Sequence, residues 1–388
     1  VPRGRFSYTH IPPYNPSFGF VSDQLILSWA VRNVGGTAFV STLYTRPFLA
    51  TTPGVAHILL IHDLLPEVFG WDMSTGTWLA KRDAAATASA VVAVSQHSAR
   101  EFLRIYPKIR PSYLGKMSHH TAAAARPVWV AHNGVDTSVF HPVVDDSKLG
   151  EFLNIAGLGP SVPYVLIVGT RLGYKNARNA YRAIEAATGT SSPLALVLVG
   201  GGPVAPEELE MLEEISNWKH IGVGSETTYG ASNTLAITVD DDLLAAAYTG
   251  AVALLHLPVG EGFGLTVLEA FACGCPVVAS NIPSFREIAG LPDRQQETEM
   301  GNRVPLSADG IAATPAGSRY KGTASSLNGG LILVDDPESA TQIWRAIRAL
   351  MSADDARRKA ISKALVQRAR VFDSWQPLAD ALVKAAVD

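Results

Sequence analysis

The residues best suited to chemistry follow two apolar stretches of the chain. After the run Tyr164–Gly169 come two cations, Arg171 and Lys175, directly before a helix-like stretch. Such cations donate to phosphate oxygens, and the amides of a helix start add partial positive charge. The first segment therefore predicts a diphosphate site at a strand end, with solvated loop cations as the alternative.

The second segment, Gly260–Ser280, opens at the end of an apolar strand, turns on glycines and runs into a short helix that stops at Gly274. The amides of Gly262–Leu265 would lie at a helix N-terminus, which suits anionic or sugar oxygens. Glu261 precedes this helix and Glu269 lies inside it, roughly 7 to 8 Å from the turn. Two carboxylates at that offset can hold two parts of one extended ligand; the alternative is an N-cap partner and an ordinary helix residue.

Parallel strands are needed to bring these segments together. Apolar runs alternate with helix-like stretches in two blocks, which is typical of parallel sheets covered by helices on both faces. The expected strands are 37–41, 57–63, 91–95 and 128–133 in the first block, and 164–169, 194–200, 252–257 and 276–280 in the second. The expected helices are 77–88, 96–106, 176–187, 242–248 and 265–273, followed by a mainly helical region from 337 to 386. We expect an α/β fold of two doubly wound Rossmann-like domains facing a cleft, with the site at the carboxyl ends of the strands.

The pattern also predicts where the domains divide. Turn-forming residues interrupt it between 140 and 163, so we place the N-terminal domain at 1–157 and the C-terminal domain at 158–373. The stretch 291–328 has no periodicity and is too long for an ordinary loop. It is an insertion, a mobile lid or a partner surface, and a plain surface excursion is favoured.

Composition excludes several classes of protein. With 388 residues, 47% hydrophobic and 17% charged, the chain is expected to fold rather than remain disordered. A net charge of −3 argues against a nucleic-acid partner. The two cysteines provide no disulfide framework and favour a reducing compartment. No apolar run of 18 residues predicts a membrane-spanning helix.

The two segments together resemble the retaining glycosyltransferases of family four, which have the GT-B fold. The resemblance rests on Gly169, Arg171 and Lys175 followed by the Glu-Gly-Phe-Gly turn and Glu269, together with Gly200-Gly-Gly-Pro, Arg286-Glu-Ile-Ala-Gly and Trp375. It covers the C-terminal half in detail. The N-terminal half matches more loosely, through Ile61-His-Asp-Leu-Leu-Pro-Glu, Ala93-Val-Ser and Ala131-His-Asn-Gly. By the same resemblance, the last helix, 374–388, crosses back to the N-terminal domain.

The resemblance implies roles for particular residues. The catalytic group would be Glu261, Arg171, Lys175 and His62: the two cations would neutralise the departing diphosphate, Glu261 would orient the donor sugar, and His62 would contact donor or acceptor. A structural histidine bonded to nearby backbone is an equal alternative for His62. Donor binding is assigned to Glu269, on the ribose diol, and to Gly262, Phe263, Gly264, Leu265, Thr266, Gly169 and Asn133.

The function implied is transfer of a hexose from a GDP- or UDP-sugar to a hydroxyl of a sugar, glycan or lipid acceptor. Transfer would retain configuration by front-face attack, without a metal or other cofactor, in an enzyme that is cytoplasmic or peripheral to a membrane. A nucleotide-sugar epimerase and a catalytically silent nucleotide-sugar-binding protein on the same fold are the alternatives.

Weaker patterns have plainer explanations. Asp240-Asp-Asp242 contains a metal-site pattern, but it stands directly before a helix, which favours capping, and no metal is predicted. Cys273 and Cys275 are expected to be inert buried thiols. The basic stretch 100–126 would give weak contact with an anionic membrane, although a solvated face is favoured. Residues 1–20 lack the family's usual first strand and Gly-rich loop, so we expect a shortened N-terminal half or missing chain.

Overall fold

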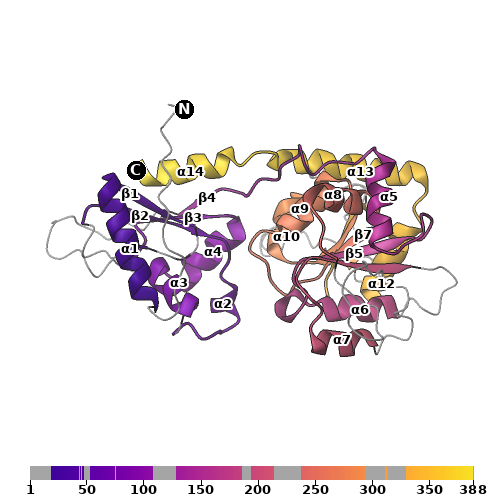
Figure 1. Cartoon of the computed structure of the whole chain (residues 1–388), viewed down its shortest axis with the longest axis horizontal. Coiled ribbons are helices and arrows are strands. Elements are labelled where there is room, and N and C mark those ends of the chain that lie inside the picture. The colour runs from indigo at the N-terminus through magenta and orange to yellow at the C-terminus, as the bar shows by residue number, and fades with distance from the viewer. Residues whose placement is uncertain are drawn as a thin grey trace. The chain divides into compact units, whose positions relative to one another are not determined.

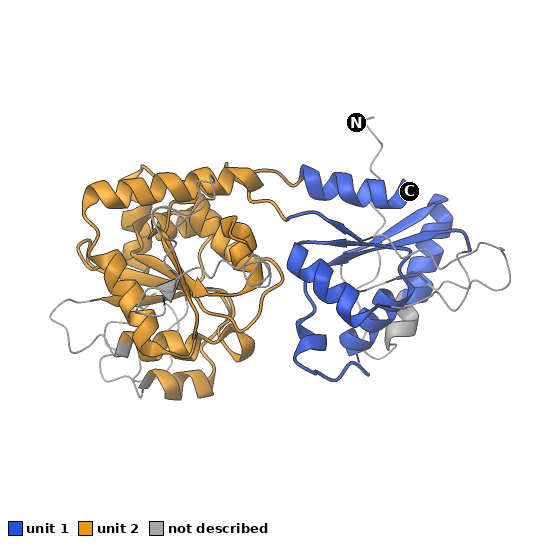
Figure 2. Ribbon diagram, turned by 180° about the vertical axis from the view of Figure 1, so that it is seen from behind, with its two compact units in different colours: residues 1–132, 376–388 blue, residues 133–375 orange. Residues whose placement is uncertain are grey.

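The computed structural model divides the chain into two compact units (Figures 1 and 2). Unit 1 comprises residues 1–132 and 376–388, and unit 2 comprises residues 133–375. The structure describes residues 19–42, 44, 46–47, 53–74, 76–107, 128–185, 194–213, 237–292, 311–312 and 329–387. The expected division at 157/158 was therefore wrong, because the segment that follows residue 132 packs with the second unit.

Unit 1 contains a parallel sheet with the order β1-β2-β3-β4 in its described part. Its elements are α1 (Gly19–Val34), β1 (Ala38–Ser41), β2 (Ala56–Ile61), α2 (Leu65–Val68), α3 (Gly76–Thr87), β3 (Ala90–Ala93), α4 (Gln96–Ile105), β4 (Val128–Val130) and α14 (Gln376–Val387). The last helix, α14, packs on β1 to β4 of unit 1, although the residues before it in the chain belong to unit 2. The four strands lie where the apolar runs predicted them, since strands buried on both faces read as continuous apolar sequence.

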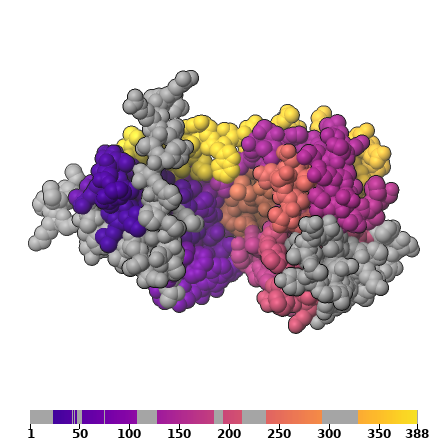
Figure 3. Space-filling view, viewed as in Figure 1, coloured from indigo at the N-terminus to yellow at the C-terminus, as the bar shows by residue number. Residues whose placement is uncertain are grey.

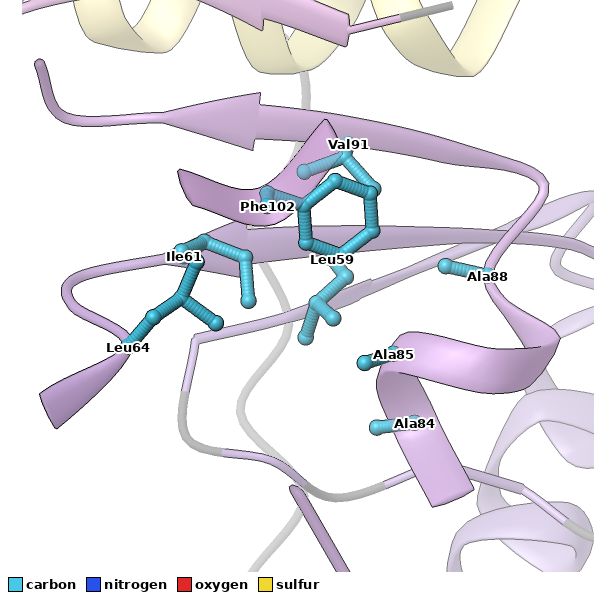
Figure 4. Packing of buried hydrophobic residues seen from close by; sticks show 8 residues of the cluster. All are labelled: Leu59, Ile61, Leu64, Ala84, Ala85, Ala88, Val91 and Phe102. Atoms are coloured by element: carbon cyan, nitrogen blue, oxygen red, sulfur yellow. The ribbon is translucent and has the colours of Figure 1, made fainter. Parts of the chain in front are cut away.

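The core of unit 1 is centred on Phe102 of α4 (Figure 4). Its ring is 2% exposed and packs against strand residues Leu59 and Val91, with the alanines of α3 closing the other side. Ser95 caps α4 by accepting from the Ser98 amide, which fixes the start of the helix after β3. The cap and the buried ring together orient α4 against the sheet.

Unit 2 contains a sheet with the order β6-β5-β7-β8-β10-β9 in its described part, parallel except for β9. Its elements are α5 (Asp146–Ile155), β5 (Tyr164–Val168), the 3-10 turn η2 (Gly173–Lys175), α6 (Ala177–Glu185), β6 (Ala195–Val199), α7 (Pro206–Glu213), α8 (Asp241–Gly250), β7 (Ala253–His256), α9 (Leu265–Ala272), β8 (Val277–Ser280), α10 (Pro283–Ala289), β9 (Ile311–Ala312), β10 (Leu331–Val334), α12 (Ala340–Met351), α13 (Asp355–Ala369) and η5 (Arg370–Phe372). The α/β fold with two parallel-sheet units is thus confirmed.

Helix α5 explains the misplaced boundary. The sequence analysis took 140–163 as an interruption, but Asp145 caps a helix there by accepting from the Ser147 amide. Phe152 of α5 is fully buried and its ring lies 5.7 Å from that of Tyr164 on β5, and α5 packs on α8. The helix is therefore held by tertiary contacts of unit 2 rather than by a strong local pattern.

Several weaker expectations can be checked, and others cannot. Asp240 caps α8 by accepting from the Leu243 amide at 2.9 Å, which confirms the capping interpretation. Cys273 and Cys275 are buried, and burial raises the pKa of both thiols, that of Cys275 to about 12. Most of the stretch 291–328, residues 108–126 and residues 1–18 lie outside the described residues. No helix in the described part of the chain is long and apolar enough to cross a membrane.

The core of unit 1 provides a first test. Phe102→Ala should lower the free energy of unfolding by about 3 to 5 kcal/mol, because it removes a buried ring and leaves a cavity. Leu103→Ala, on the 52% exposed neighbour, should cost less than about 0.5 kcal/mol. Urea denaturation of both variants measures the difference; equal losses would contradict the packing described.

Candidate functional site

The loop after β5 is held against the neighbouring strand ends of unit 2. Gly169 has φ +86° and η2 ends at Asn176, whose φ of 58° is left-handed. The Asn176 side-chain amide donates to the carbonyl oxygens of Leu257 at 3.0 Å and Pro337 at 3.2 Å. The Val259 amide in turn donates to the Tyr174 carbonyl at 2.8 Å. These bonds place Lys175 beside the segment that follows β7.

The loop after β6 approaches the same place through glycines. Gly200, Gly201 and Gly202 all have positive φ, between 67° and 79°. A Cβ atom on Gly201 would overlap the Gly169 carbonyl and the Arg171 guanidinium. A side chain at position 201 would therefore separate the two loops, so the glycine is required by close backbone contact.

The guanidinium of Arg171 is buried and is not exposed at these strand ends. Its side chain is 2% exposed, and its Nε donates to Glu208 Oε1 at 2.6 Å. Its Nη1 donates to the Gly200 carbonyl at 2.6 Å, and its Nη2 to the carbonyls of Gly202 and Pro203. Direct contact of Arg171 with a diphosphate therefore stays a prediction; in this structure the guanidinium holds the β5 and β6 loops together.

Lys175 and Glu261 form an ion pair where β5 and β7 end. The Lys175 Nζ lies 2.6 Å from Glu261 Oε2, and each side chain is less than a fifth exposed. His256, the last residue of β7, has its Nε2 3.7 Å from the same oxygen. The structure thus brings together two of the predicted catalytic residues from positions far apart in the sequence.

The charge state of this cluster follows from its partners. Burial alone would raise the pKa of Glu261, but His256 and the Lys175 ammonium outweigh it and hold the pKa at about 2. Burial lowers the pKa of His256, and Lys175 adds to this, against the opposing effect of Glu261. At neutral pH the cluster therefore holds an ionised Glu261 carboxylate beside a neutral His256 imidazole.

The Gly262–Thr266 segment is positioned by packing. Gly264 is the N-cap of α9 with φ +110°, and a Cβ there would come within 2.6 Å of the Phe285 ring. Phe263 is 3% exposed, with its ring 5.9 Å from that of Phe372. The Phe263 side chain therefore anchors the turn, and only its backbone is suited to a ligand. Helix α9 begins at Leu265, as predicted.

Glu269 lies on α9 in a mostly apolar setting. Burial raises its pKa, the Tyr248 hydroxyl opposes this by donating to Glu269 Oε2 at 3.2 Å, and Asp241 raises the pKa further. The carboxylate has one oxygen bonded to a rigid, buried phenol. The second oxygen is suited to accept from a ligand hydroxyl, which agrees in chemistry with the role implied for Glu269.

His62 belongs to unit 1, at the end of β2. Its Nε2 lies 2.9 Å from the Thr42 carbonyl oxygen, which can only accept, so Nε2 donates in this bond. His62 is thus bonded to backbone, as its structural alternative expects. The Nδ1 atom takes no part in this bond. The neighbouring Asp63 is fixed by the fully buried Lys81, whose Nζ lies 3.4 Å from Asp63 and 2.8 Å from Glu67.

Asn133 is the first residue of unit 2 and is 7% exposed. The next residue, Gly134, lies so close to the Ser374 backbone that a Cβ would come within 2.7 Å of it. The segment is thus fixed to the returning chain. No hydrogen bond or ion pair between described residues of unit 2 brings Asn133 to the Lys175 and Glu261 cluster, so its donor-binding role stays a prediction.

Sequence reasoning missed three residues that shape the site: His256, Tyr248 and Glu208. His256 had a usable signal, because it is a polar residue ending an apolar strand at the edge where ligands bind. Tyr248 and Glu208 act through contacts on other helices, which spacing does not reveal. Among the described residues, no group of three or more His, Cys, Asp or Glu side chains is arranged to hold a metal ion.

Comparison with known proteins relates the segment that carries these residues to a family. The family model for glycosyl transferases group 1 matches residues 152–293, which contain Arg171, Lys175, Glu261 and Glu269. This segment of the chain is thus similar to the glycosyl transferases of group 1. Alpha-maltose-1-phosphate synthase of Mycobacterium tuberculosis (strain H37Rv) is 27% identical over 362 residues, covering 90% of this chain and 83% of that protein. D-inositol 3-phosphate glycosyltransferase of Mycobacteroides abscessus is 30% identical over 191 residues, covering 49% of this chain and 38% of that protein.

Solved structures confirm the GT-B fold of this chain. Sucrose-phosphate synthase from Thermosynechococcus elongatus superposes with a TM-score of 0.61 at 16% identity, covering 99% of this chain and 85% of that one. An Anabaena protein in complex with UDP and glucose superposes with a TM-score of 0.56 at 14% identity, covering 92% and 81%. At such identities the likeness concerns the fold, and it agrees with the expected pair of Rossmann-like domains.

The buried Arg171–Glu208 pair provides a second prediction. Arg171→Met or Glu208→Leu alone should lower the free energy of unfolding by about 3 to 5 kcal/mol, because each leaves the other charge buried without its partner. The double variant should lose less than the sum of the two. Urea denaturation of the four proteins completes the cycle; additive losses would show that the pair is not energetically coupled.

The low pKa of Glu261 provides a third prediction. The carboxylate binds fewer protons folded than unfolded, so its stabilisation is complete above its ordinary pKa of 4.5 and is lost as the pH falls through about 2. Glu261→Gln should therefore lower the free energy of unfolding at pH 6 by roughly 1 to 3 kcal/mol, and the deficit should shrink between pH 5 and pH 2. Urea denaturation across this range measures it.

Glu151→Gln, on the exposed face of α5, is the matched control and should show no such trend. A deficit of Glu261→Gln that stays constant from pH 6 to pH 2 would contradict the ionised, paired state of Glu261.

Proposed function

We propose that this glycosyltransferase moves a hexose from a nucleoside diphosphate sugar to a hydroxyl acceptor with retention of configuration. The observation that carries the proposal is the Lys175–Glu261 pair at the carboxyl ends of β5 and β7, beside the N-terminus of α9. A diphosphate entering this edge of the sheet offers Lys175 a doubly charged partner in place of one carboxylate oxygen. Binding frees Glu261 to accept from the hydroxyls of the donor sugar.

The relatives and neighbours support this class of donor. The Anabaena protein is described in complex with UDP-glucose in a second structure, and a trehalose-6-phosphate protein from E. coli is described with UDP-2-fluoro glucose. The names of the sequence relatives point to sugar phosphates, inositol phosphate and mannosyl chains. A UDP- or GDP-hexose and an acceptor that is a sugar, glycan or lipid fit this range.

The electrostatics of the site favour a front-face mechanism over one that needs a protein base. Glu261, with a pKa of about 2, is too weak a base to take a proton from an acceptor hydroxyl near neutral pH. Glu269 is bonded to Tyr248 and lies within a helix. In the proposed reaction the anomeric carbon–phosphate oxygen bond breaks, the acceptor oxygen bonds to the same face of that carbon, and the acceptor proton passes to the departing phosphate oxygen.

The protein would stabilise charge rather than supply the proton acceptor. Lys175 would neutralise the departing diphosphate as its charge develops, together with the first amides of α9, Leu265 and Thr266. Arg171 would act as a positioning residue, since its bonds to Gly200 and Gly202 hold the loops that place Lys175. The transfer is proposed to proceed without a metal ion.

Donor binding is tested by thermal shift with UDP, GDP, ADP and their hexose derivatives. A true donor at about 100 times its dissociation constant should add about 2.7 kcal/mol of stability. Lys175→Ala should weaken donor binding at least tenfold, because it removes the cation facing the diphosphate. Lys148→Ala, on exposed α5, should leave the shift unchanged. The absence of any shift with the whole panel would overturn the donor assignment.

Turnover with the donor that binds then tests the chemistry. NMR of the product should show the anomeric configuration of the donor, and EDTA should leave the rate unchanged. Inversion, or activity that requires an added divalent cation, would contradict the mechanism. Isolation of an epimerised donor without any transfer product would show that the activity is epimerisation and not transfer.

A further inference from the structure

A second cavity, lined by cations, lies in unit 2 at the amino ends of the strands, whereas the Lys175–Glu261 pair lies at their carboxyl ends. It has a volume of about 790 Å³, in the range of small-molecule pockets, and lies between α13 and the segments that lead into β7 and β8. Val252 and Pro276 in its wall directly precede those strands. The donor-side residues follow the carboxyl ends of β5 and β7, whereas this groove lies at the amino ends of β7 and β8.

Helix α13 gives the groove its charge. The helix lies beside α8 and α9 in Figure 1, and Figure 3 shows the C-terminal helices bordering the residues of α5 on the surface of this unit. Its groove-lining residues recur at intervals of four, which places them on one face of the helix. That face carries Arg358, Lys359 and Lys363, and Arg370 follows at the helix end. Like charges at i and i+4, such as Lys359 and Lys363, repel each other weakly, and a nearby anionic group would compensate for that repulsion.

Carboxylates do not provide that compensation in the described part of the chain. None of the residues lining the groove is Asp or Glu. The described ion pairs include none of the four cations, and Asp355, one turn before Lys359, forms none with it. Arg358 is instead held in place by donating to the carbonyls of Ala353 at 2.9 Å and Met351 at 3.2 Å.

Helix C-termini account for only part of the positive charge. Helices α8, α9, α12 and α13 all end at the groove or at Arg358, and each end supplies about half a negative charge. Together they offset roughly two of the four positive charges. An excess of about two positive charges therefore faces the groove, which is the complement of a ligand with two negative charges.

The walls of the groove are rigid. A Cβ on Gly274 would overlap the Ser362 side chain, so α13 lies directly on the end of α9. The Thr249 hydroxyl donates to the Ala245 carbonyl at 2.8 Å and accepts from the Val143 amide at 3.1 Å, which fixes the wall beside Pro142. The cations on α13 are thus displayed on a preformed surface, so a ligand does not bear the cost of ordering it.

We infer that this groove binds a phosphate-bearing ligand of sugar-phosphate size at a site separate from the donor. Its phosphate groups would contact Lys359, Lys363 and Arg370, and Arg358 would donate its remaining N–H groups. A soluble phosphorylated sugar and a phosphorylated lipid headgroup share this chemistry. The inference rests on the geometry of unit 2 alone and does not depend on the proposed transfer reaction.

Calorimetric titration of the full chain with inorganic tripolyphosphate tests the site. The Lys175→Ala background removes the donor-side cation, so binding there should be at least tenfold weaker and should contribute little. In this background, Lys359→Glu with Lys363→Glu should weaken tripolyphosphate binding at least tenfold, because two attractions become repulsions. Arg345→Glu with Arg348→Glu, on the exposed face of α12, changes the net charge equally and should alter binding less than twofold.

Equal losses in the two reversal variants would show diffuse attraction to net charge and overturn the inference, as would the absence of binding in the Lys175→Ala background. Circular dichroism checks that both variants remain folded; if the double glutamate variant unfolds, Lys359→Gln with Lys363→Gln replaces it, with a weaker but still selective loss expected. Titration with glucose 6-phosphate and sedimentation with phosphatidylglycerol vesicles then distinguish a soluble ligand from a lipid headgroup. If the Lys359/Lys363 variant loses only vesicle binding, the ligand is a lipid headgroup. If it loses glucose 6-phosphate binding, the ligand is a soluble sugar phosphate.

Discussion

The contact between Arg171 and Glu208 is the constraint on which the donor-side edge of unit 2 depends. Both side chains are at most 2% exposed, so neither charge is tolerable without the other. Glu208 also accepts from the Tyr181 hydroxyl. The Nη1 and Nη2 atoms of Arg171 donate to backbone carbonyls of the loop after β6. One buried pair thereby joins α6, α7 and two strand ends. Lys175 can be presented at a fixed place because its loop cannot move independently of the sheet.

The second pair, Lys175 with Glu261, has the opposite character. Its side chains are 18% and 17% exposed, and its partners include a neutral imidazole rather than a closed set of carbonyls. The pair is still reached by solvent, and a diphosphate would offer Lys175 another anionic partner, so an incoming anion could compete with Glu261 for the lysine. The two pairs therefore differ in role. The buried Arg171–Glu208 pair fixes the loops, and the more accessible Lys175–Glu261 pair could exchange partners when a ligand enters.

The sequence was informative where local chemistry decides structure. Strands buried on both faces appear as apolar runs, and Asp240 before a helix is a cap by the nature of its side chain. It was uninformative where a distant partner decides. Helix α5 contains Gly150 and has a weak pattern, so only its packing through Phe152 against Tyr164 reveals it, and the boundary was misplaced as a result. The same limit applies to Arg171: its partner lies on α7, a helix that was not predicted, and a buried arginine and a phosphate-binding arginine look alike in sequence.

The two edges of the unit 2 sheet acquire different chemistry from the polarity of parallel β-α units. At the carboxyl ends of the strands, helices begin, and their partial positive charge is balanced by acidic groups such as Glu261 until a ligand arrives. At the amino ends, helices finish, and their partial negative charge attracts cations such as Arg358. Charge of that origin accounts for part of the four basic residues that line the groove, three on α13 and Arg370 directly after it. The surplus fits the ligand inferred for this groove, at the strand ends opposite to those proposed for the donor.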